Sequence, residues 1–228
     1  MVLPPNIFAH NRATVTAQYS VMPPAGVLPS RIPGIEGAII RILTAPPMGA
    51  GFAQIMLELE EGGGTTAPRD EGVQHFFYLV EGAVELGIDG ETHALTQGGY
   101  AYVPVRHAYT FNATEESRLL WIKKPYEAID LAAPGPIVGN RDLIERQRPH
   151  TEGRYWQYLL PADDLAFDLN INILGFSPGS YFPYVETHIM EHGLYMLEGQ
   201  GLYLLANDWH ETQPDDFIWM GPYCPQHF

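Results

Sequence analysis

Hydrophobic and polar residues alternate in short runs along much of this chain, and glycine or proline separates one run from the next. A period of two is typical of β-strands, whose successive side chains point to opposite faces of a sheet. The clearest example is HFFYLVEGAVELGIDG, which begins at His75 and predicts a strand, a turn and a returning strand. No segment has the pattern of a long amphipathic helix. The pattern therefore predicts short β-strands joined by tight turns.

The same pattern occurs twice. A second segment, HGLYMLEGQGLYLLAND, begins at His192, 117 residues after His75. The offset also relates the pair Glu81 and Gly82 to the pair Glu198 and Gly199. Downstream, GGYAYVPVRHAYTF from Gly98 resembles DDFIWMGPYCPQHF from Asp215. Self-similarity at a fixed offset indicates repeated structural units, so we predict an all-β fold with two tandem, homologous domains.

The segments outside the repeats set the expected domain boundaries. Residues 1–35 lack strong periodicity and are expected to form an arm that packs on a neighbouring domain or subunit. Residues 36–130 are predicted to form the first domain and residues 151–228 the second. Residues 131–150 are rich in proline, glycine and charge, which is typical of a linker. One short helical turn is expected there, around residues 142–146.

Composition and charge exclude several functional classes. The net charge is −15, from 27 acidic against 12 basic residues, so nucleic acid and anionic membranes are not expected partners. No apolar stretch approaches the ~18 residues of a membrane span, and the N-terminus has no secretory signal pattern. The single cysteine, Cys224, excludes an internal disulfide. We therefore expect a cytoplasmic protein.

Candidate metal ligands cluster in the second domain. Glu186 and His188 are two residues apart, so on a β-strand their side chains face the same way and can share one ion. His192 keeps that parity if the strand continues, or is delivered by a turn onto the adjacent strand. Gln226 or His227 is the candidate fourth ligand, and only one can ligate because neighbours on a strand face opposite ways. A carboxylate, two imidazoles and a carboxamide oxygen suit Mn²⁺, Fe²⁺ or Ni²⁺ better than Zn²⁺.

The spacing of these residues resembles the two-part signature of the cupins, which are small jelly-roll β-barrels. The matching positions are Gly179, Glu186, His188, His192, Gly199, Pro222 and Gln226. The usual cupin order is His-x-His, then Glu, then His, so three of the ligand types differ here. In this departure the chain resembles the two-domain (S)-ureidoglycine aminohydrolases of purine breakdown, whose C-terminal site has Glu-x-His-x3-His and a later Pro-Gln. The resemblance is closest from Leu197 to Gln226.

The resemblance implies a fold, a reaction and a set of site residues. The fold is two tandem cupin domains, and the reaction releases ammonia from (S)-ureidoglycine to give ureidoglycolate in purine and allantoin breakdown. By resemblance, Mn²⁺ is held by Glu186, His188, His192 and Gln226. The resemblance also places Tyr203 in the substrate pocket with Glu186 and His188, and we expect Glu186 to act as the catalytic acid and base. Cupins commonly associate, so a homo-oligomer is expected.

Two other functions stay open at this point. The first is a different cupin enzyme, a dioxygenase or an isomerase, because one fold hosts many chemistries. The second is a cupin without catalytic activity that binds a small ligand. Loss of the ligand pattern in both copies would favour the second, but only the first copy has lost it: Arg69, Glu71, His75 and Tyr109 stand at the matching positions.

The first copy is therefore expected to lack a metal, because the Arg69 guanidinium would repel a cation. His107, with Glu71 and His75, is an alternative weak site there. The two copies also differ in length. The first continues from Pro104 to Lys124, whereas the second reaches Phe228 only six residues after Pro222. From this difference the second domain is expected to lack its closing strand.

Overall fold

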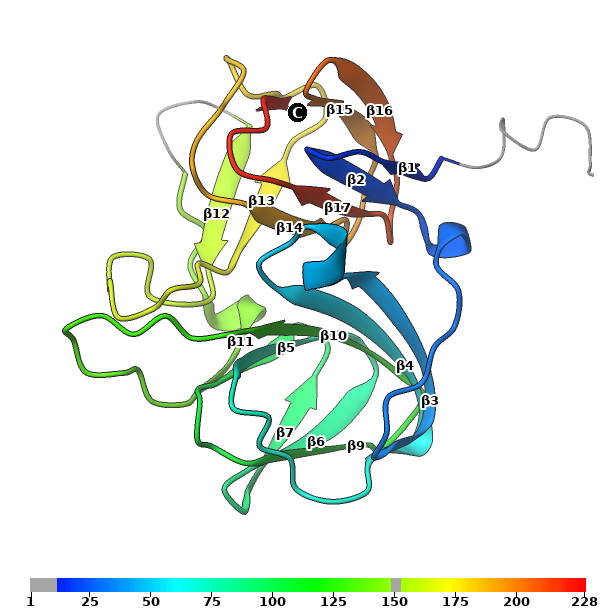
Figure 1. Cartoon of the computed structure of the whole chain (residues 1–228), viewed down its shortest axis with the longest axis vertical. Helices are drawn as coiled ribbons and strands as arrows, with labels where there is room; N and C mark the ends of the chain where they lie inside the picture. Colours follow the sequence, from blue (N-terminus) through cyan, green and yellow to red (C-terminus); the bar gives the residue numbers. More distant parts are fainter. Residues whose placement is uncertain (1–11, 149–152) are drawn as a thin grey trace, which may run out of the picture. The chain divides into compact units, whose positions relative to one another are not determined.

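The computed structural model describes residues 12–148 and 153–228, whose regular secondary structure is almost entirely β-strand (Figure 1). In this part of the chain the helices are three short 3₁₀ turns: η1 (Pro24–Gly26), η2 (Pro46–Met48) and η3 (Arg141–Leu143). None of the described helices has the length and hydropathy needed to span a membrane. The prediction of an all-β fold is confirmed, and η3 lies at the position of the expected helical turn.

Two compact units make up the chain. Among the described residues, unit 1 comprises 12–29, 41–53 and 181–228, and unit 2 comprises 30–40, 54–148 and 153–180. This grouping differs from the boundaries expected from the sequence, because residues 153–180 belong to unit 2 and residues 12–29 are grouped with residues 181–228. Sequence composition marks linkers but does not reveal pairing between distant strands, which decides the grouping here.

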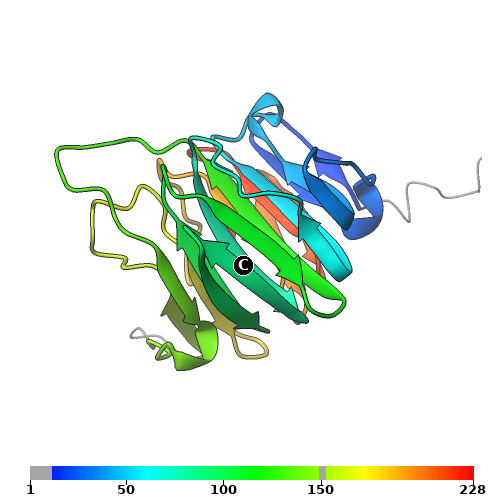
Figure 2. The same ribbon diagram turned by 90° about the horizontal axis from the view of Figure 1, so that it is seen from below.

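Unit 2 is built on one large sheet. Its strands are β3 (Ile35–Thr44), β4 (Ala53–Thr65), β5 (Gln74–Glu81), β6 (Ala83–Ile88), β7 (Glu91–Thr96), β8 (Gly99–Val103), β9 (Tyr109–Ala113), β10 (Ser117–Lys124) and β11 (Ile137–Asn140). The order is β11-β8-β5-β10-β4-β9-β6-β7, with β3 paired to β4. Figure 2 shows the green strands of this sheet side by side. A separate pair, β12 (Arg154–Tyr158) and β13 (Asn172–Phe176), belongs to the same unit.

The alternation seen in the sequence explains how this sheet forms its core. In β6 the side chains of Val84, Leu86 and Ile88 are buried and Glu85 is exposed, as expected for a strand with one face on the core. Strand β5 is buried over most of its length because β8 and β10 flank it. Trp121 of β10 is fully buried in the hydrophobic core cluster that also contains Val84, Leu86 and Ile88.

Unit 1 contains two smaller sheets. The strands are β1 (Thr14–Val15), β2 (Tyr19–Met22), β14 (His192–Tyr195), β15 (Gly201–Leu205), β16 (Asp208–Thr212), β17 (Phe217–Met220) and β18 (Gln226–His227). One sheet has the order β1-β2-β17-β14 and the other β16-β15-β18. Strand β2, from the predicted N-terminal arm, pairs with β17 near the end of the chain.

The two repeats fold in the same order. Strands β14 to β18 lie at the positions that the sequence offset assigns to β5, β6, β7, β8 and β9. However, β14, the counterpart of β5, pairs with fewer strands. β5 lies between β8 and β10, whereas β14 pairs only with β17 among the described strands. The edge of the sheet in unit 1 is therefore where the two repeats differ.

A shared glycine provides a test of this difference. Gly82 and Gly199 both have a positive φ, near +89° and +79°. A side chain on Gly82 would lie 2.3 Å from Ser117 Oγ, but one on Gly199 would meet nothing within 4 Å. We expect Gly82→Ala to lower the free energy of unfolding by about 3 kcal/mol and Gly199→Ala by about 1 kcal/mol. Urea unfolding of both variants measures the difference, and equal losses would contradict it.

Candidate metal centre

Two segments of unit 1 that pair with each other, at Glu186 and at Gln226, carry predicted ligands. Glu186 and Gln226 exchange two backbone hydrogen bonds, of 2.8 and 2.9 Å, and Gln226 also pairs with Leu205 of β15. His192 is the first residue of β14. Residues 187–191 form a loop, so the expectation that Glu186 and His188 share a regular strand is wrong. The turn that the sequence left as an alternative delivers His192 to the site.

Two histidine rings meet in this part of the chain. The Nε2 atoms of His188 and His192 are 3.0 Å apart, and their ring planes are inclined at 66°. The Nε2 atom of Gln226 lies 3.1 Å from the same nitrogen of His188. On the far side of the carboxamide, the Tyr203 hydroxyl donates a 3.0 Å hydrogen bond to Gln226 Oε1. Four of the five predicted site residues therefore converge.

This geometry fits a divalent ion. Two ligand atoms bonded at ~2.1 Å and at right angles around an ion lie about 3.0 Å apart, which is the spacing of the two ring nitrogens. A direct hydrogen bond requires one of the two rings to donate, whereas an ion accepts a lone pair from both. Burial, together with the smaller effect of the neighbouring His188, lowers the pKa of His192 to about 4, so His192 is neutral at neutral pH. Neutral imidazole is the form that binds metals.

Glu186 meets the other predicted site residues through its backbone, which pairs with that of Gln226. Within residues 12–148 and 153–228, no three His, Cys, Asp or Glu side chains gather closely enough to hold an ion. The carboxylate of Glu186 is near Tyr203, however. Burial raises the pKa of the Tyr203 hydroxyl, and the charge of Glu186 raises it further. Glu186 therefore lies at the margin of the site, joined to it through its backbone contact with Gln226.

The structure separates the two candidates for the fourth position. The Gln226 carboxamide is buried against His188 and Tyr203. The His227 ring instead lies between Trp209 and Tyr181, with centroid distances of 5.9 and 6.3 Å. This is the alternation expected for neighbouring residues on a strand, and it places Gln226 on the side of the histidines.

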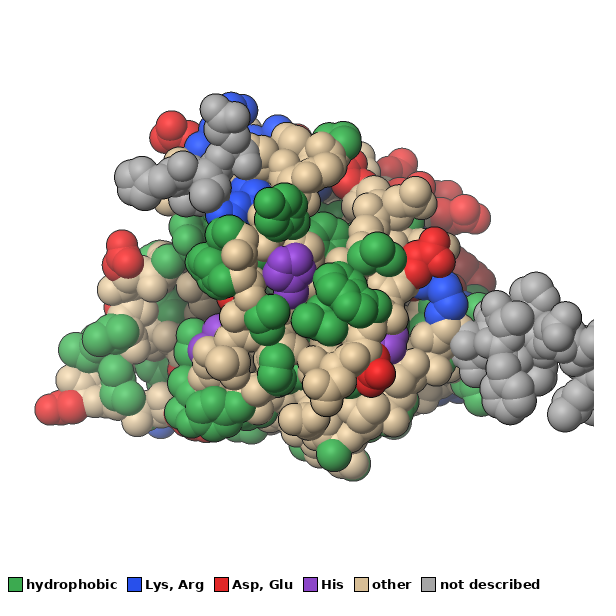
Figure 3. Space-filling model, turned by 90° about the horizontal axis from the view of Figure 1, so that it is seen from above, with side chains coloured by type: hydrophobic (Ala, Val, Ile, Leu, Met, Phe, Trp, Pro, Cys, Tyr) green, Lys and Arg blue, Asp and Glu red, His purple; other side chains and the backbone are tan. Residues whose placement is uncertain are grey.

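Several exposed apolar side chains lie beside the predicted ligands in the sequence. They are Tyr184, Val185, Ile189 and Met190. The space-filling view from above shows hydrophobic side chains next to a histidine on the surface (Figure 3). Small-molecule sites commonly combine an apolar lining with a few polar groups.

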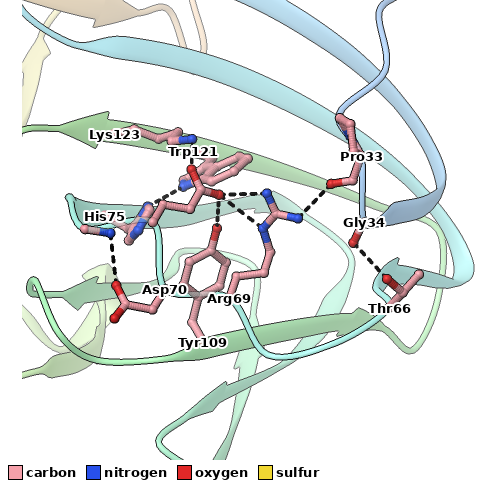
Figure 4. A network of polar contacts seen from close by, with 11 residues as sticks. Pro33, Gly34, Thr66, Arg69, Asp70, His75, Tyr109, Trp121 and Lys123 are labelled. Atoms are coloured by element: carbon pink, nitrogen blue, oxygen red, sulfur yellow. Dashed lines mark hydrogen bonds and ion pairs between the residues drawn. The ribbon is translucent and has the colours of Figure 1, made fainter.

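The matching positions of unit 2 hold a network of charged groups (Figure 4). Arg69 donates hydrogen bonds of 3.1 and 2.8 Å from Nε and Nη2 to Glu71 Oε1. Tyr109 donates to the same oxygen at 3.1 Å, and Lys123 contacts Glu71 Oε2. Burial alone would raise the pKa of Glu71, but Lys123 and Arg69 outweigh it and lower the pKa to about 2. Two fixed cations thus stand around the one carboxylate, an environment that disfavours a bound metal ion.

His75 completes this network. Trp121 Nε1 donates a 3.1 Å hydrogen bond to His75 Nδ1, which places the ring proton on Nε2. That Nε2 is buried without a hydrogen-bond partner in the described part of the chain. Burial lowers the pKa of His75 to about 4. His107, the alternative ligand considered for this copy, contacts Asp89 instead, at 2.6 Å.

Sequence reasoning missed Lys123 and Trp121. Both belong to β10, which pairs with β5 so that Lys123 stands opposite His75. The available signal was the run RLLWIKK, whose alternation predicts a strand with Trp121 and Lys123 on one face. The run does not indicate which strand it pairs with, because the register of pairing between distant strands is set by the fold.

A cavity of about 550 Å³ occurs elsewhere in unit 2. Its lining includes Tyr100, Ile137, Gln147 and Tyr158. None of the residues predicted for the metal site or for its degenerate copy lines this cavity. Its size is that of a small-molecule pocket, but it holds none of the candidate chemistry.

Comparison with known proteins supports the relationship that the sequence suggested. The cupin domain family model matches residues 55–123. The (S)-ureidoglycine aminohydrolase of Escherichia coli (strain K12) is 37% identical over 222 residues, which is 95% of this chain and 84% of that protein. A probable (S)-ureidoglycine aminohydrolase of Oryza sativa subsp. japonica is 31% identical over 98% of this chain and 70% of its own length.

Solved structures agree with this relationship. The crystal structure of protein Ylba from E. coli superimposes with a TM-score of 0.88 at 34% identity, covering 99% of this chain and 92% of that one. A Bacillus subtilis oxalate decarboxylase mutant superimposes with a TM-score of 0.73 at 12% identity, covering 100% of this chain and 80% of that one, so it shows the fold alone. From the identity and coverage of its relatives, the chain belongs to the (S)-ureidoglycine aminohydrolase family of cupin proteins.

Proposed function

We propose that this chain hydrolyses (S)-ureidoglycine to ureidoglycolate and ammonia at the site in unit 1. The observation that carries the proposal is the convergence of His188, His192 and Gln226 within 3.1 Å contacts, in a chain 37% identical to an enzyme of that name. In the reaction, water supplies the new oxygen on the α-carbon, the bond from that carbon to the amino nitrogen breaks, and one proton of the water leaves with the ammonia.

The ligands of the site are His188, His192 and Gln226, with Glu186 as the fourth. A bound divalent ion, proposed to be Mn²⁺, would supply Lewis acidity to the substrate and stabilise the charge that develops as the C–N bond breaks. The two imidazoles offer their Nε2 lone pairs, and the carboxamide offers its oxygen. Substrate contacts are assigned to Tyr203, Glu186 and His188.

Glu186 is assigned the proton transfer. Its carboxylate stands outside the three converging ligands, so one oxygen is free to take a proton from water and pass it to the leaving amine. Its backbone is fixed by the two hydrogen bonds with Gln226, which keep the side chain at the edge of the site. The carboxylate must then come within ~3 Å of the leaving nitrogen.

Exchanging the Glu186 carboxylate for an amide tests this assignment. Glu186→Gln keeps the size of the side chain but cannot carry a proton between water and amine, so we expect ammonia release to fall by about 100-fold or more. Mn²⁺ content, measured by elemental analysis, should remain within about threefold because three other ligands stay in place. Unchanged ammonia release with the metal still bound would refute the catalytic role.

The function as a whole is tested by elemental analysis of the purified protein and an ammonia assay on freshly generated ureidoglycine, with and without the metal. Ammonia release that depends on the metal supports the proposal. Oxygen consumption with a diketone or thiol substrate, and no ammonia release, would favour a dioxygenase instead. Assembly as a homo-oligomer and a place in the cytoplasm stay predictions from the sequence.

A further inference from the structure

The side chain of Gln226 is held at both ends. Its residue is 6% exposed, and its backbone pairs with Glu186 on one side and with Leu205 of β15 on the other. The carboxamide oxygen accepts from the Tyr203 hydroxyl at 3.0 Å, and the carboxamide nitrogen lies 3.1 Å from His188 Nε2. With its backbone fixed in this way, the carboxamide can exchange its two ends by rotation but has little freedom to move away.

The end that now faces the histidines is not the end that binds a cation. A carboxamide coordinates hard divalent ions through its oxygen, and its NH₂ group offers only donors. An ion between His188 and His192 therefore requires the Gln226 oxygen on the side of the rings. The NH₂ group must then point at the Tyr203 hydroxyl. A hydroxyl can donate to the oxygen or accept from the nitrogen, so it can pair with either end.

We infer that Tyr203 is the residue that positions the Gln226 carboxamide, pairing with its oxygen in the metal-free site and with its NH₂ group when the oxygen ligates the ion. This inference rests on the proposed function, because it concerns the same metal. Tyr203 is 5% exposed, and its hydroxyl is the only hydrogen-bond partner of the carboxamide oxygen within the described residues. Phenylalanine would fill the same volume but could pair with neither end.

A double-mutant cycle isolates this role. Tyr203→Phe should weaken Mn²⁺ binding by about 10- to 100-fold, the range found when a group that orients a metal ligand is removed. In the Gln226→Glu background the same substitution should cost less than about threefold, because the two oxygens of a carboxylate are equivalent and either can face the ion. The measurement is Mn²⁺ titration of each full chain by isothermal calorimetry.

Tyr19→Phe is the matched control. Tyr19 belongs to the same buried cluster as Tyr203, but its hydroxyl contacts Asp208 and His210, not the predicted ligands. It should leave Mn²⁺ affinity within about threefold of the unsubstituted chain. Far-ultraviolet circular dichroism and thermal unfolding without metal establish that each variant is folded.

Three results would overturn the inference. Tyr203→Phe could leave the Mn²⁺ affinity unchanged, it could weaken binding equally in the unsubstituted chain and in the Gln226→Glu background, or Tyr19→Phe could weaken binding as much. The ammonia assay separates these results from failure of the proposed function. If the unsubstituted chain binds no Mn²⁺ yet releases ammonia, the metal and this inference fail together, while the reaction itself stands.

Discussion

Replacing His188 with alanine should remove the bound metal and reduce ammonia release at least 1,000-fold, to about the level seen without metal. His188 is the centre of the converging group, because both the His192 ring and the Gln226 carboxamide contact its Nε2 atom. Without it, one imidazole and one neutral carboxamide remain. Such a set is too weak to hold a divalent ion against water, and Glu186 alone does not complete it.

Substitutions of two other histidines, His227 and His93, test whether the expected loss is specific to His188. His227→Ala should retain the metal, since the His227 ring lies against Trp209 and Tyr181, away from His188. His93→Ala, in β7 of unit 2, controls for the loss of any imidazole. Elemental analysis and ammonia release are measured for all three variants. A His188→Ala chain that keeps its metal, or a His227→Ala chain that loses it, would show that the ligand set is wrong.

The repeat offset placed β14 to β18 against β5 to β9, and the alternation of a strand puts Gln226, not His227, beside His188, while its role as a ligand stays a prediction. The predicted strand through Glu186 and His188 was wrong for a local reason. One pair of backbone hydrogen bonds forms at Glu186, and the chain then turns through a loop, so residue parity did not apply.

Long-range strand pairing could not be predicted from the sequence. Strand β2 joins β17 across almost the whole chain, and no spacing between residues encodes that choice. The same limit applies to Lys123, which stands opposite His75 only because β10 adopts a particular register on β5. The arginine at position 69 led to the expectation that this copy lacks a metal, which stays a prediction. It did not reveal that a second cation and a buried tryptophan complete the network.

The network of unit 2 should contribute several kcal/mol to the stability of its fold. Glu71→Ala should lower the free energy of unfolding by about 4 kcal/mol, because it leaves two cations, Arg69 and Lys123, close together and largely buried without their carboxylate. The measurement is urea unfolding at neutral pH. Glu85→Gln, on the exposed face of β6, is the charge-matched control and should change stability by less than about 0.5 kcal/mol.

A second substitution separates charge from packing. Lys123→Met removes one of the two cations and keeps an apolar stem, so adding it to Glu71→Ala should recover part of the lost stability. If the losses of Glu71→Ala and Lys123→Met simply add, the two residues do not interact, and the network is only a set of neighbouring contacts.

Acid should reproduce part of the effect of the Glu71 substitution in the unsubstituted chain. The pKa of Glu71 is lowered from an ordinary 4.5 to about 2, so its contribution is complete above pH 4.5 and is lost as the pH falls toward 2. The shift corresponds to at most about 3 kcal/mol. His75, whose pKa is lowered from 6.5 to about 4, loses its contribution in the higher window, between those two values. In Glu71→Gln, the free energy of unfolding should therefore change little between pH 4.5 and 2 but should still fall between pH 6.5 and 4. If its slope below pH 4.5 is the same as in the unsubstituted chain, groups other than Glu71 cause the acid sensitivity.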